Sequence, residues 1–297
     1  LEKEKLLFEK EMKLLLLNSA ESEMEKPDEF DRELLGSPNN SALWIRYMAF
    51  FIQKQEIQKA RDVAERALKS INYREVKEIL NVWTAMLNLE AHYGDETTLK
   101  ELFYRAAKAN DEETIYRQLL RIYQTLEKVE AADELLEEML KKFKTEDVER
   151  WLLGAQHFMN TNRPEKCHEL MQRALKVLSP QQHVQLITRF AQLEFKCGES
   201  GDPERGKTLF ESVLSTYPRR VDVWNVYTDM LIKYRTKEEV RAVMERASNQ
   251  RLNAHKMKQI FKKWLDFESK HGTEATVTAV RNKASDFVKT LGEDEDH

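Results

Sequence analysis

Residues 44–51, Trp-Ile-Arg-Tyr-Met-Ala-Phe-Phe, and residues 59–68, Lys-Ala-Arg-Asp-Val-Ala-Glu-Arg-Ala-Leu, are the two halves of a unit that recurs along this chain. In the first half, Trp44, Tyr47 and Phe51 are spaced so that they lie on one stripe of an α-helix. In the second half, Ala67 is small enough for a neighbouring helix to approach closely. The stretch therefore predicts two helices that pack through an aromatic stripe and a small residue.

The unit recurs at intervals of 33 to 39 residues. Its first helix opens on a large apolar residue at Trp44, Trp83, Tyr116, Trp151, Ile187, Trp224 and Phe261, and the same stripe carries Tyr227 and Trp264. Its second helix carries a small or medium apolar residue at Ala67, Ala106, Met139, Ala174, Val213, Ala247 and Ala284. Six of these seven second landmarks lie 23 residues after the first; the exception is lengthened at Gly198–Pro203, where a longer turn is expected.

This period predicts an all-α fold, a right-handed superhelical solenoid of about seven antiparallel helix pairs. Only 8 Gly and 6 Pro interrupt the 297 residues, which favours long helices. We expect a leading charged helix and linker over residues 1–42, including a helix at 28–35, then the repeat array over 43–290 and a disordered acidic tail over 291–297. Because the chain begins at Leu1 and not at Met, we expect it to be part of a longer polypeptide.

Composition argues against several classes of function. The formal net charge of −4 is far from the strongly basic balance of a protein that binds nucleic acid with its whole surface. Cys167 and Cys197 are the only cysteines, so a multi-cysteine zinc module and a disulfide framework are not expected. The apolar run Leu14–Leu17 is far shorter than the ~20 residues of a membrane span. We expect no membrane segment, no small-molecule substrate and no cofactor.

The sequence predicts no catalytic group. Cys167 and His168 are adjacent on a helix, so their side chains diverge by about 100° and do not form a nucleophile and base. An acid follows the opening residue by seven positions at Glu90, Glu194 and Glu268, which places each carboxylate on the buried stripe. One carboxylate per unit offers no second catalytic group, so we interpret each as a structural ion pair, for example Glu90 with Arg105 of the following helix.

Basic residues gather in three places that are candidates for binding RNA or an acidic partner. They are Lys141, Lys142 and Lys144; Arg219 and Arg220; and His255, Lys258, Lys262 and Lys263. The last four are expected on the solvated face of a helix whose other face is apolar, where they would form a basic surface. An ordinary solvated helix face accounts for the same pattern, because lysine pairs are common on helices.

The repeated text resembles the HAT (half-a-TPR) motif of RNA-processing proteins, in which a W-x-x-Y helix precedes an A-R-x-x-x-E-R-A-L helix. Residues 35–50, 59–68, 80–90, 190–195, 201–205 and 219–224 further resemble the helical region of the ribosomal-RNA-processing protein five family. The resemblance implies a longer parent with OB-fold RNA-binding repeats ahead of a C-terminal HAT array, a nuclear and nucleolar location, and a role in pre-ribosomal RNA cleavage. Tyr116 and Met139 depart from the motif in the third unit.

We therefore expect a HAT-repeat scaffold, and not an enzyme, that binds assembly proteins of the small-subunit processome during ribosome biogenesis. Pre-rRNA is an expected partner of the parent protein. Two alternatives remain open: an array that binds RNA directly through its basic residues, and a HAT scaffold in splicing or messenger-RNA 3′-end processing.

Overall fold

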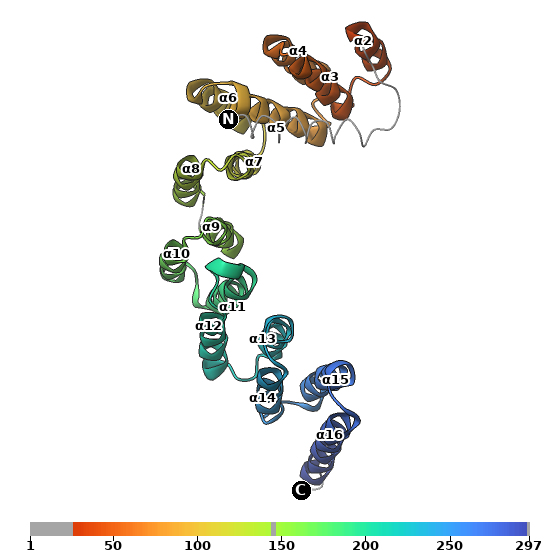
Figure 1. The fold of residues 1–297 in the computed structure, drawn as a ribbon, viewed down its shortest axis with the longest axis vertical. Helices are drawn as coiled ribbons and strands as arrows, with labels where there is room; N and C mark the ends of the chain where they lie inside the picture. Colours follow the sequence, from red (N-terminus) through yellow and green to blue (C-terminus); the bar gives the residue numbers. More distant parts are fainter. Residues whose placement is uncertain (1–25, 144–146, 296–297) are drawn as a thin grey trace. The chain divides into compact units, whose positions relative to one another are not determined.

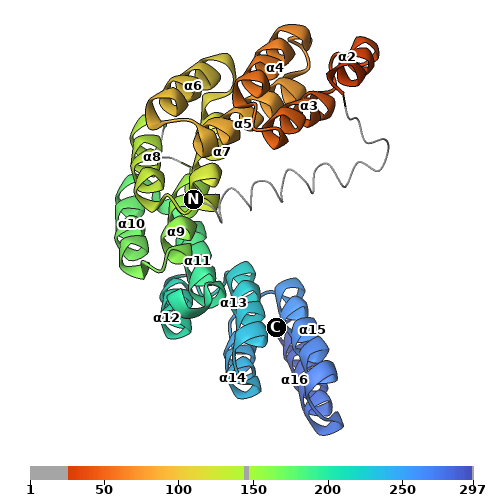
Figure 2. The same ribbon diagram turned by 45° about the horizontal axis from the view of Figure 1, so that its top comes forward.

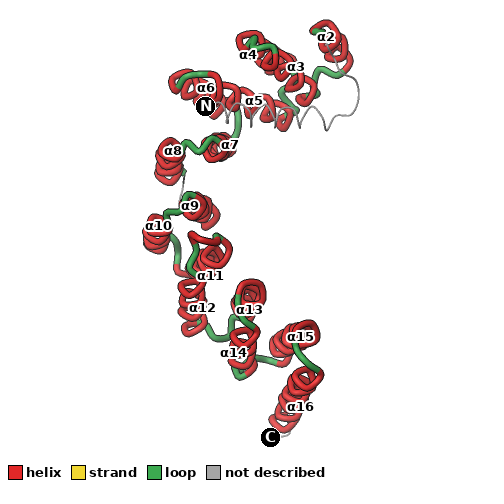
Figure 3. The backbone as a smooth tube through the Cα atoms, viewed as in Figure 1, coloured by secondary structure: helices red, strands yellow, loops and turns green. Residues whose placement is uncertain are grey.

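The computed structural model describes residues 26–143 and 147–295, and every regular element in these ranges is a helix (Figure 3). The chain divides into two compact units, residues 1–143 and 144–297, each built from helix pairs. The first 25 residues of the expected leading helix and linker, and the candidate residue Lys144, lie outside the described residues.

Over residues 26–143, the first unit consists of a single helix followed by three helix pairs (Figures 1 and 2). Each helix packs against its neighbours in the chain, and α5 also packs against α3 and α7. The helices are α2 (Pro27–Gly36), α3 (Ser41–Gln53) with α4 (Ile57–Ser70), α5 (Val76–Tyr93) with α6 (Glu96–Ala109), and α7 (Glu112–Thr125) with α8 (Val129–Lys142).

The second unit contains four pairs, with the first helices of successive pairs in contact. They are α9 (Val148–Asn160) with α10 (Pro164–Val177), α11 (Pro180–Lys196) with α12 (Pro203–Thr216), α13 (Val221–Tyr234) with α14 (Lys237–Ser248), and α15 (Ala254–His271) with α16 (Glu274–Glu295). A 3₁₀ turn, η1 (Gly198–Ser200), occupies the lengthened connection between α11 and α12. The predicted class, an all-α array of seven helix pairs, is confirmed.

The core of each unit forms where the opening residue of a first helix meets small residues of the second helices. Trp44, Trp151 and Trp224 are each 2% exposed, while Ala67 and Ala174 are fully buried. A methyl group in place of a longer side chain lets two helix backbones approach, and the indole fills the remaining space. The repeated Trp and Ala are therefore explained by packing.

Helix α2 packs on α3 in the same way as the second helix of a complete pair. Phe30 and Leu34 are buried, and the Phe30 ring stacks on Tyr47 with centroids 4.7 Å apart. The Trp44 indole donates to the carbonyl of Pro38 at 2.8 Å. This packing begins ahead of the boundary expected at residue 43, because the helix placed in the linker contributes its apolar face to the core.

The last helix also differs from the expectation. Helix α16 continues to Glu295, so residues 291–295, which we expected to be disordered, are helical. Gly292 costs a helix roughly 1 kcal/mol, too little to end one that is already formed, and no Pro follows it. Ala284, the small residue expected on this last second helix, is half-buried, whereas Ala67 and Ala106 at the same position in other pairs are fully buried.

Candidate interaction surfaces

Two of the three acids on the buried stripes accept a bidentate bond from an arginine of the preceding second helix. Arg61 on α4 donates to Glu90 on α5 from Nε at 2.6 Å and from Nη2 at 2.9 Å. Arg241 on α14 donates to Glu268 on α15 at 2.9 and 3.0 Å. The arginine holds the pKa of Glu268 below its usual range, against the opposing effect of burial. These carboxylates are neutralised by ion pairing and serve as structural groups.

The third acid, Glu194, is paired with His168 of the preceding second helix, and Arg205 of α12 also lies 3.6 Å from its Oε1. His168 Nε2 lies 2.7 Å from Glu194 Oε1, and the backbone N–H of Asp202 donates to Oε2 at 2.9 Å. Neighbouring Cys167 is 1% exposed, and burial raises the pKa of its thiol to about 12. A buried thiol in this state supplies almost no thiolate near neutral pH, which agrees with the prediction that Cys167 and His168 form no nucleophile–base pair.

The prediction that Arg105 pairs with Glu90 is wrong. Arg105 donates from Nη2 to Glu65 at 2.9 Å, and its guanidinium lies 5.4 Å from the Trp83 ring centre. The contact joins α4 and α6, the second helices of consecutive pairs. Arg105 directly precedes the small residue Ala106, and at that position the side chain faces the preceding second helix. Glu90 instead faces α4 from within the core.

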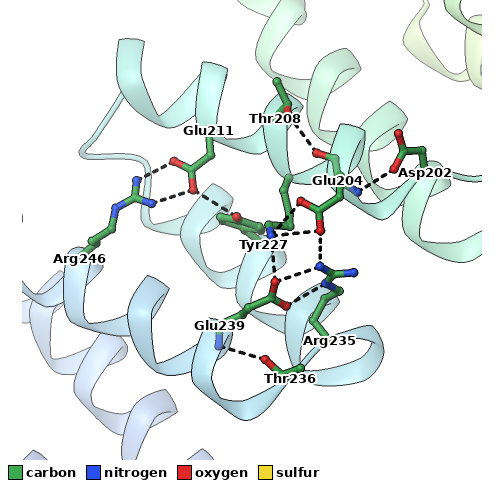
Figure 4. A network of polar contacts seen from close by, with 10 residues as sticks. Asp202, Glu204, Thr208, Glu211, Tyr227, Arg235, Thr236, Glu239 and Arg246 are labelled. Atoms are coloured by element: carbon green, nitrogen blue, oxygen red, sulfur yellow. Dashed lines mark hydrogen bonds and ion pairs between the residues drawn. The ribbon is translucent and has the colours of Figure 1, made fainter.

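The same kind of contact in the second unit includes a tyrosine (Figure 4). Arg246 on α14 donates to both oxygens of Glu211 on α12, at 2.8 and 2.6 Å, and the Tyr227 hydroxyl donates to Glu211 Oε1 at 3.1 Å. Arg246 holds the pKa of Glu211 below its usual range. In unit 1, Asp31 on α2 accepts from Arg66 at 2.8 Å and from Tyr47 at 3.5 Å.

A second network, made of four residues, also joins α12 to α14 (Figure 4). Arg235 and Lys207 both donate to Glu239, at 2.8 and 2.9 Å, and Arg235 also reaches Glu204. The two cations lower the pKa of Glu239 from 4.5 to about 2. The network links α12, α13 and α14. Its charged groups pair with one another and stabilise the packing of these helices, so they are not a candidate ligand site.

Several candidate basic residues are engaged within the array. Lys142 bonds Glu112 at 2.6 Å, which raises the pKa of the lysine, and Arg220 makes a bidentate pair with Asp222. Lys263 donates to the Asn225 carbonyl at 2.6 Å and is 21% exposed. The expectation that Lys263 shares the solvated face of α15 is therefore wrong, because it turns toward α13.

The remaining candidates are exposed. Lys141 lies at the end of α8, Arg219 in the turn before α13, and Lys258 and Lys262 one turn apart on α15. His255 is also exposed, 3.1 Å from Gln259. On α15 the structure brings together His255, Lys258 and Lys262.

Sequence reasoning missed the basic partners of the buried acids, although the repeat carried a signal for them. A base lies six positions before the small residue of a second helix at Arg61, His168 and Arg241, in the three units that precede Glu90, Glu194 and Glu268. A glycine follows each acid by four positions, at Gly94, Gly198 and Gly272. A Cβ at Gly94 would lie 2.2 Å from Glu90 Oε2, and one at Gly272 2.1 Å from Glu268 Oε2. Gly94 and Gly272 therefore leave room for the carboxylate, whereas a Cβ at Gly198 would meet nothing within 4 Å.

Neither a metal site nor a membrane span is found in the described parts of the chain. Across residues 26–143 and 147–295, His, Cys, Asp and Glu do not gather in a group of three or more that could hold a metal ion. None of the helices described there has both the length and the apolar character needed to cross a bilayer.

Family models match both ends of the array. Residues 35–129 match the "Pre-mRNA-splicing factor Syf1/CRNKL1 C-terminal HAT repeat", and residues 179–296 match "Suppressor of forked protein (Suf)". Together with the helix pairs and their repeated contacts, these matches define the chain as a HAT-repeat array. The TPR protein YrrB, described as having an unusual peptide-binding site, aligns over 80% of this chain and 99% of its own, with 11% identity and a TM-score of 0.28.

Curated relatives identify the family more closely. The mouse and human RRP5 homologues are 46% and 45% identical over 265 residues, which is 89% of this chain. The Arabidopsis thaliana rRNA biogenesis protein RRP5 is 41% identical over 90% of the chain. The chain is thus homologous to the HAT-repeat region of the RRP5 family. It spans about 14% of the length of these relatives.

Proposed function

We propose that this array is a scaffold within a ribosome-assembly factor, which holds assembly proteins of the small-subunit processome during pre-rRNA processing in the nucleolus. The observation that carries the proposal is the similarity of nearly the whole chain to proteins named for rRNA biogenesis in fission yeast, Arabidopsis and Drosophila. Pre-rRNA is reached through the parent protein.

The physical character of the array supports a binding role without catalysis. Its buried carboxylates Glu90, Glu194 and Glu268 are paired with bases, and the Cys167 thiol is held in its protonated form. A thiol held in its protonated form supplies almost no nucleophilic thiolate near neutral pH. Stacked helix pairs expose a broad surface, which suits a scaffold with several contacts.

A role in splicing or messenger-RNA 3′-end processing is the second candidate, because the two matching family models take their descriptions from other HAT proteins. Those models cover 35–129 and 179–296 separately, whereas the RRP5 relatives match across both ranges and the residues between them. Continuous similarity at 38–46% identity favours ribosome assembly.

The proposal is tested by ultraviolet crosslinking of the tagged array in cells, with sequencing of attached RNA and identification of co-purified proteins. We expect small-subunit assembly proteins to co-purify, with few crosslinks to the array itself. Abundant pre-rRNA crosslinks to the array would instead support direct RNA contact. Co-purification of splicing or 3′-end factors in place of assembly proteins would refute the assignment.

A further inference from the structure

A cavity of about 430 Å³ lies within the first unit, between the second helices α6 and α8. Helix α7 contributes Leu119 and Tyr123 to its wall, and Tyr104 of α6 lies at its edge with 55% of its surface exposed. The remaining lining residues that carry charge are Glu90, Asp95, Glu96, Lys100, Lys128, Glu134 and Glu138.

The cavity lies at a junction where the arginine–glutamate pair between consecutive second helices is missing. At the previous junction, Arg105 on α6 pairs with Glu65 on α4 and lies over an aromatic ring. At this junction the position equivalent to Arg105 is Glu138, and the position equivalent to Glu65 is Tyr104. Glu138 therefore has no arginine at this junction; it accepts from the hydroxyl of Tyr116, the ring equivalent to Trp83, and the Lys142 ammonium lies 5.2 Å from that ring's centre.

The charge of the cavity is negative. Five carboxylates and two lysine ammonium groups line its wall; of the carboxylates, Glu90 is paired with Arg61 and Glu138 accepts from the Tyr116 hydroxyl. Both lysines are already engaged, Lys100 with Glu96 at 2.5 Å and Lys128 with the Ala91 carbonyl at 3.1 Å. Across the described part of the unit, Glu134 makes no hydrogen bond or ion pair.

Tyr123 supplies a buried polar group to the same cavity. Its side chain is 6% exposed, and its hydroxyl has no hydrogen-bond partner among residues 26–143. Burial raises the pKa of this hydroxyl, so the group stays neutral and can both donate and accept. The hydroxyl is open to solvent from the cavity, so a ligand there can replace water as its hydrogen-bond partner.

We propose that this cavity binds an arginine side chain from a basic, extended segment of a protein partner. The guanidinium pairs with Glu134 and Glu138 and stacks on the exposed ring of Tyr104, as Arg105 does with Glu65 and Trp83 in the same unit. A planar guanidinium suits both contacts better than an ammonium group. The inference rests on the proposed scaffold function and names the chemistry of one partner segment.

The test is fluorescence anisotropy with the whole chain and a labelled, capped peptide of alternating serine and arginine. Its controls are the same peptide with citrulline, a neutral analogue of arginine, and with lysine. We expect the arginine peptide to bind at least tenfold more tightly than the citrulline peptide and more tightly than the lysine peptide. Equal binding of the arginine and citrulline peptides would overturn the proposal.

Variants locate the site. Glu134→Gln with Glu138→Gln is expected to weaken binding of the arginine peptide at least fivefold. The matched control, Glu127→Gln with Glu130→Gln, removes two exposed carboxylates that do not line the cavity, and it is expected to change binding less than twofold. Tyr123→Phe, which removes only the hydroxyl, gives a second readout if the double variant folds poorly, and is expected to weaken binding at least twofold.

The remaining outcomes separate this proposal from the scaffold function. Equal weakening by the two double variants would indicate a general charge effect and overturn the site. A single-stranded RNA whose binding is lost with Glu134→Gln and Glu138→Gln would overturn its assignment to a peptide. If the arginine peptide fails to bind while assembly proteins still co-purify in cells, the site is wrong and the scaffold function stands. If the peptide binds at the cavity but messenger-RNA factors co-purify, the arginine site stands and the assignment of the scaffold to ribosome assembly is wrong.

Discussion

At the scale of single residues, the ion pairs of this array contribute different amounts to the free energy of unfolding because they differ in burial. The Arg61 side chain is 32% exposed and Glu90 10%, whereas Arg105 and Glu65 are 55% and 38% exposed. Removing one partner of a buried pair leaves a charge without compensation, while an exposed pair is screened by water.

We therefore expect Arg61→Leu to lower the free energy of unfolding by about 3 kcal/mol and Arg105→Leu by less than about 1 kcal/mol. Urea unfolding followed by circular dichroism measures both. The double variant Arg61→Leu with Glu90→Leu should recover part of the loss, since neither charge remains buried. Similar losses for Arg61→Leu and Arg105→Leu would contradict this account of burial.

Gly94 gives a second prediction at this scale. A Cβ there would lie 2.2 Å from Glu90 Oε2 and 2.8 Å from the Glu90 carbonyl, so Gly94→Ala displaces the carboxylate from Arg61. We expect a loss of about 2 kcal/mol in unfolding free energy. Gly36 has nothing within 4 Å of its Cβ position, and Gly36→Ala should be neutral or stabilising by up to about 1 kcal/mol. A neutral Gly94→Ala would show that the pair tolerates the methyl group.

The burial of the acids was predicted from the sequence, whereas their partners were not, although a base six positions before the small residue marks them. Seven residues make almost two helical turns, so the stripe position of Glu90 follows from the sequence alone. Whether α4 or α6 supplies the base depends on how the helices of adjacent pairs face one another, which is set by packing. For the same reason the exposure of Lys258 followed from helix periodicity, whereas the contact of Lys263 with α13 did not.

At the scale of helices, α2 takes the place of a second helix. Asp31, Tyr47 and Arg66 in the first unit make the contacts that Glu211, Tyr227 and Arg246 make in the second, and each residue of the second set lies 180 positions after its counterpart. Both Trp44 and Trp224 donate to a proline carbonyl at 2.8 Å. The helix 28–35 was predicted from the sequence, but its equivalence to α12 was hidden because the small residue that marks other second helices is replaced by Glu33.

This equivalence predicts that α2 stabilises the first unit. Phe30→Ala should remove the stack on Tyr47 and lower the free energy of unfolding by about 3–4 kcal/mol, with faster hydrogen exchange in α3. Leu35 lies on the same helix and is 86% exposed, so Leu35→Ala should change the stability by less than about 0.5 kcal/mol. Unchanged exchange in α3 of the Phe30→Ala variant would contradict the role assigned to α2.

The junction of α12, α13 and α14 predicts a dependence on pH. Folding lowers the pKa of Glu239 from 4.5 to about 2, so the carboxylate stabilises the fold above pH 4.5 and this contribution is lost as the pH falls toward 2. In Glu239→Gln, the melting temperature should be lower at pH 7 and should fall less steeply between pH 5 and pH 2. Glu238 is 79% exposed, and Glu238→Gln should keep the steeper profile. Parallel profiles for all three proteins would exclude Glu239 as a source of acid sensitivity.

At the scale of the whole molecule, the remaining question is whether the array meets RNA directly. The net charge of −4 is unlike that of a protein that binds phosphates with its whole surface, and the engagement of Lys142, Arg220 and Lys263 removes three of the clustered basic residues from such a role. Lys258 and Lys262 on α15 are the strongest remaining candidates, because both are exposed one turn apart.

We expect Lys258→Glu with Lys262→Glu to leave co-purification of assembly proteins unchanged, since a scaffold of many helix pairs does not depend on two lysines. If the array binds RNA, the same variant instead lowers the slope of log affinity against log salt by about 1.4 for single-stranded RNA, and its crosslinks fall. Lys263→Glu cannot make this distinction, because it breaks contacts with Asp229 and Asn225 that join α13 to α15.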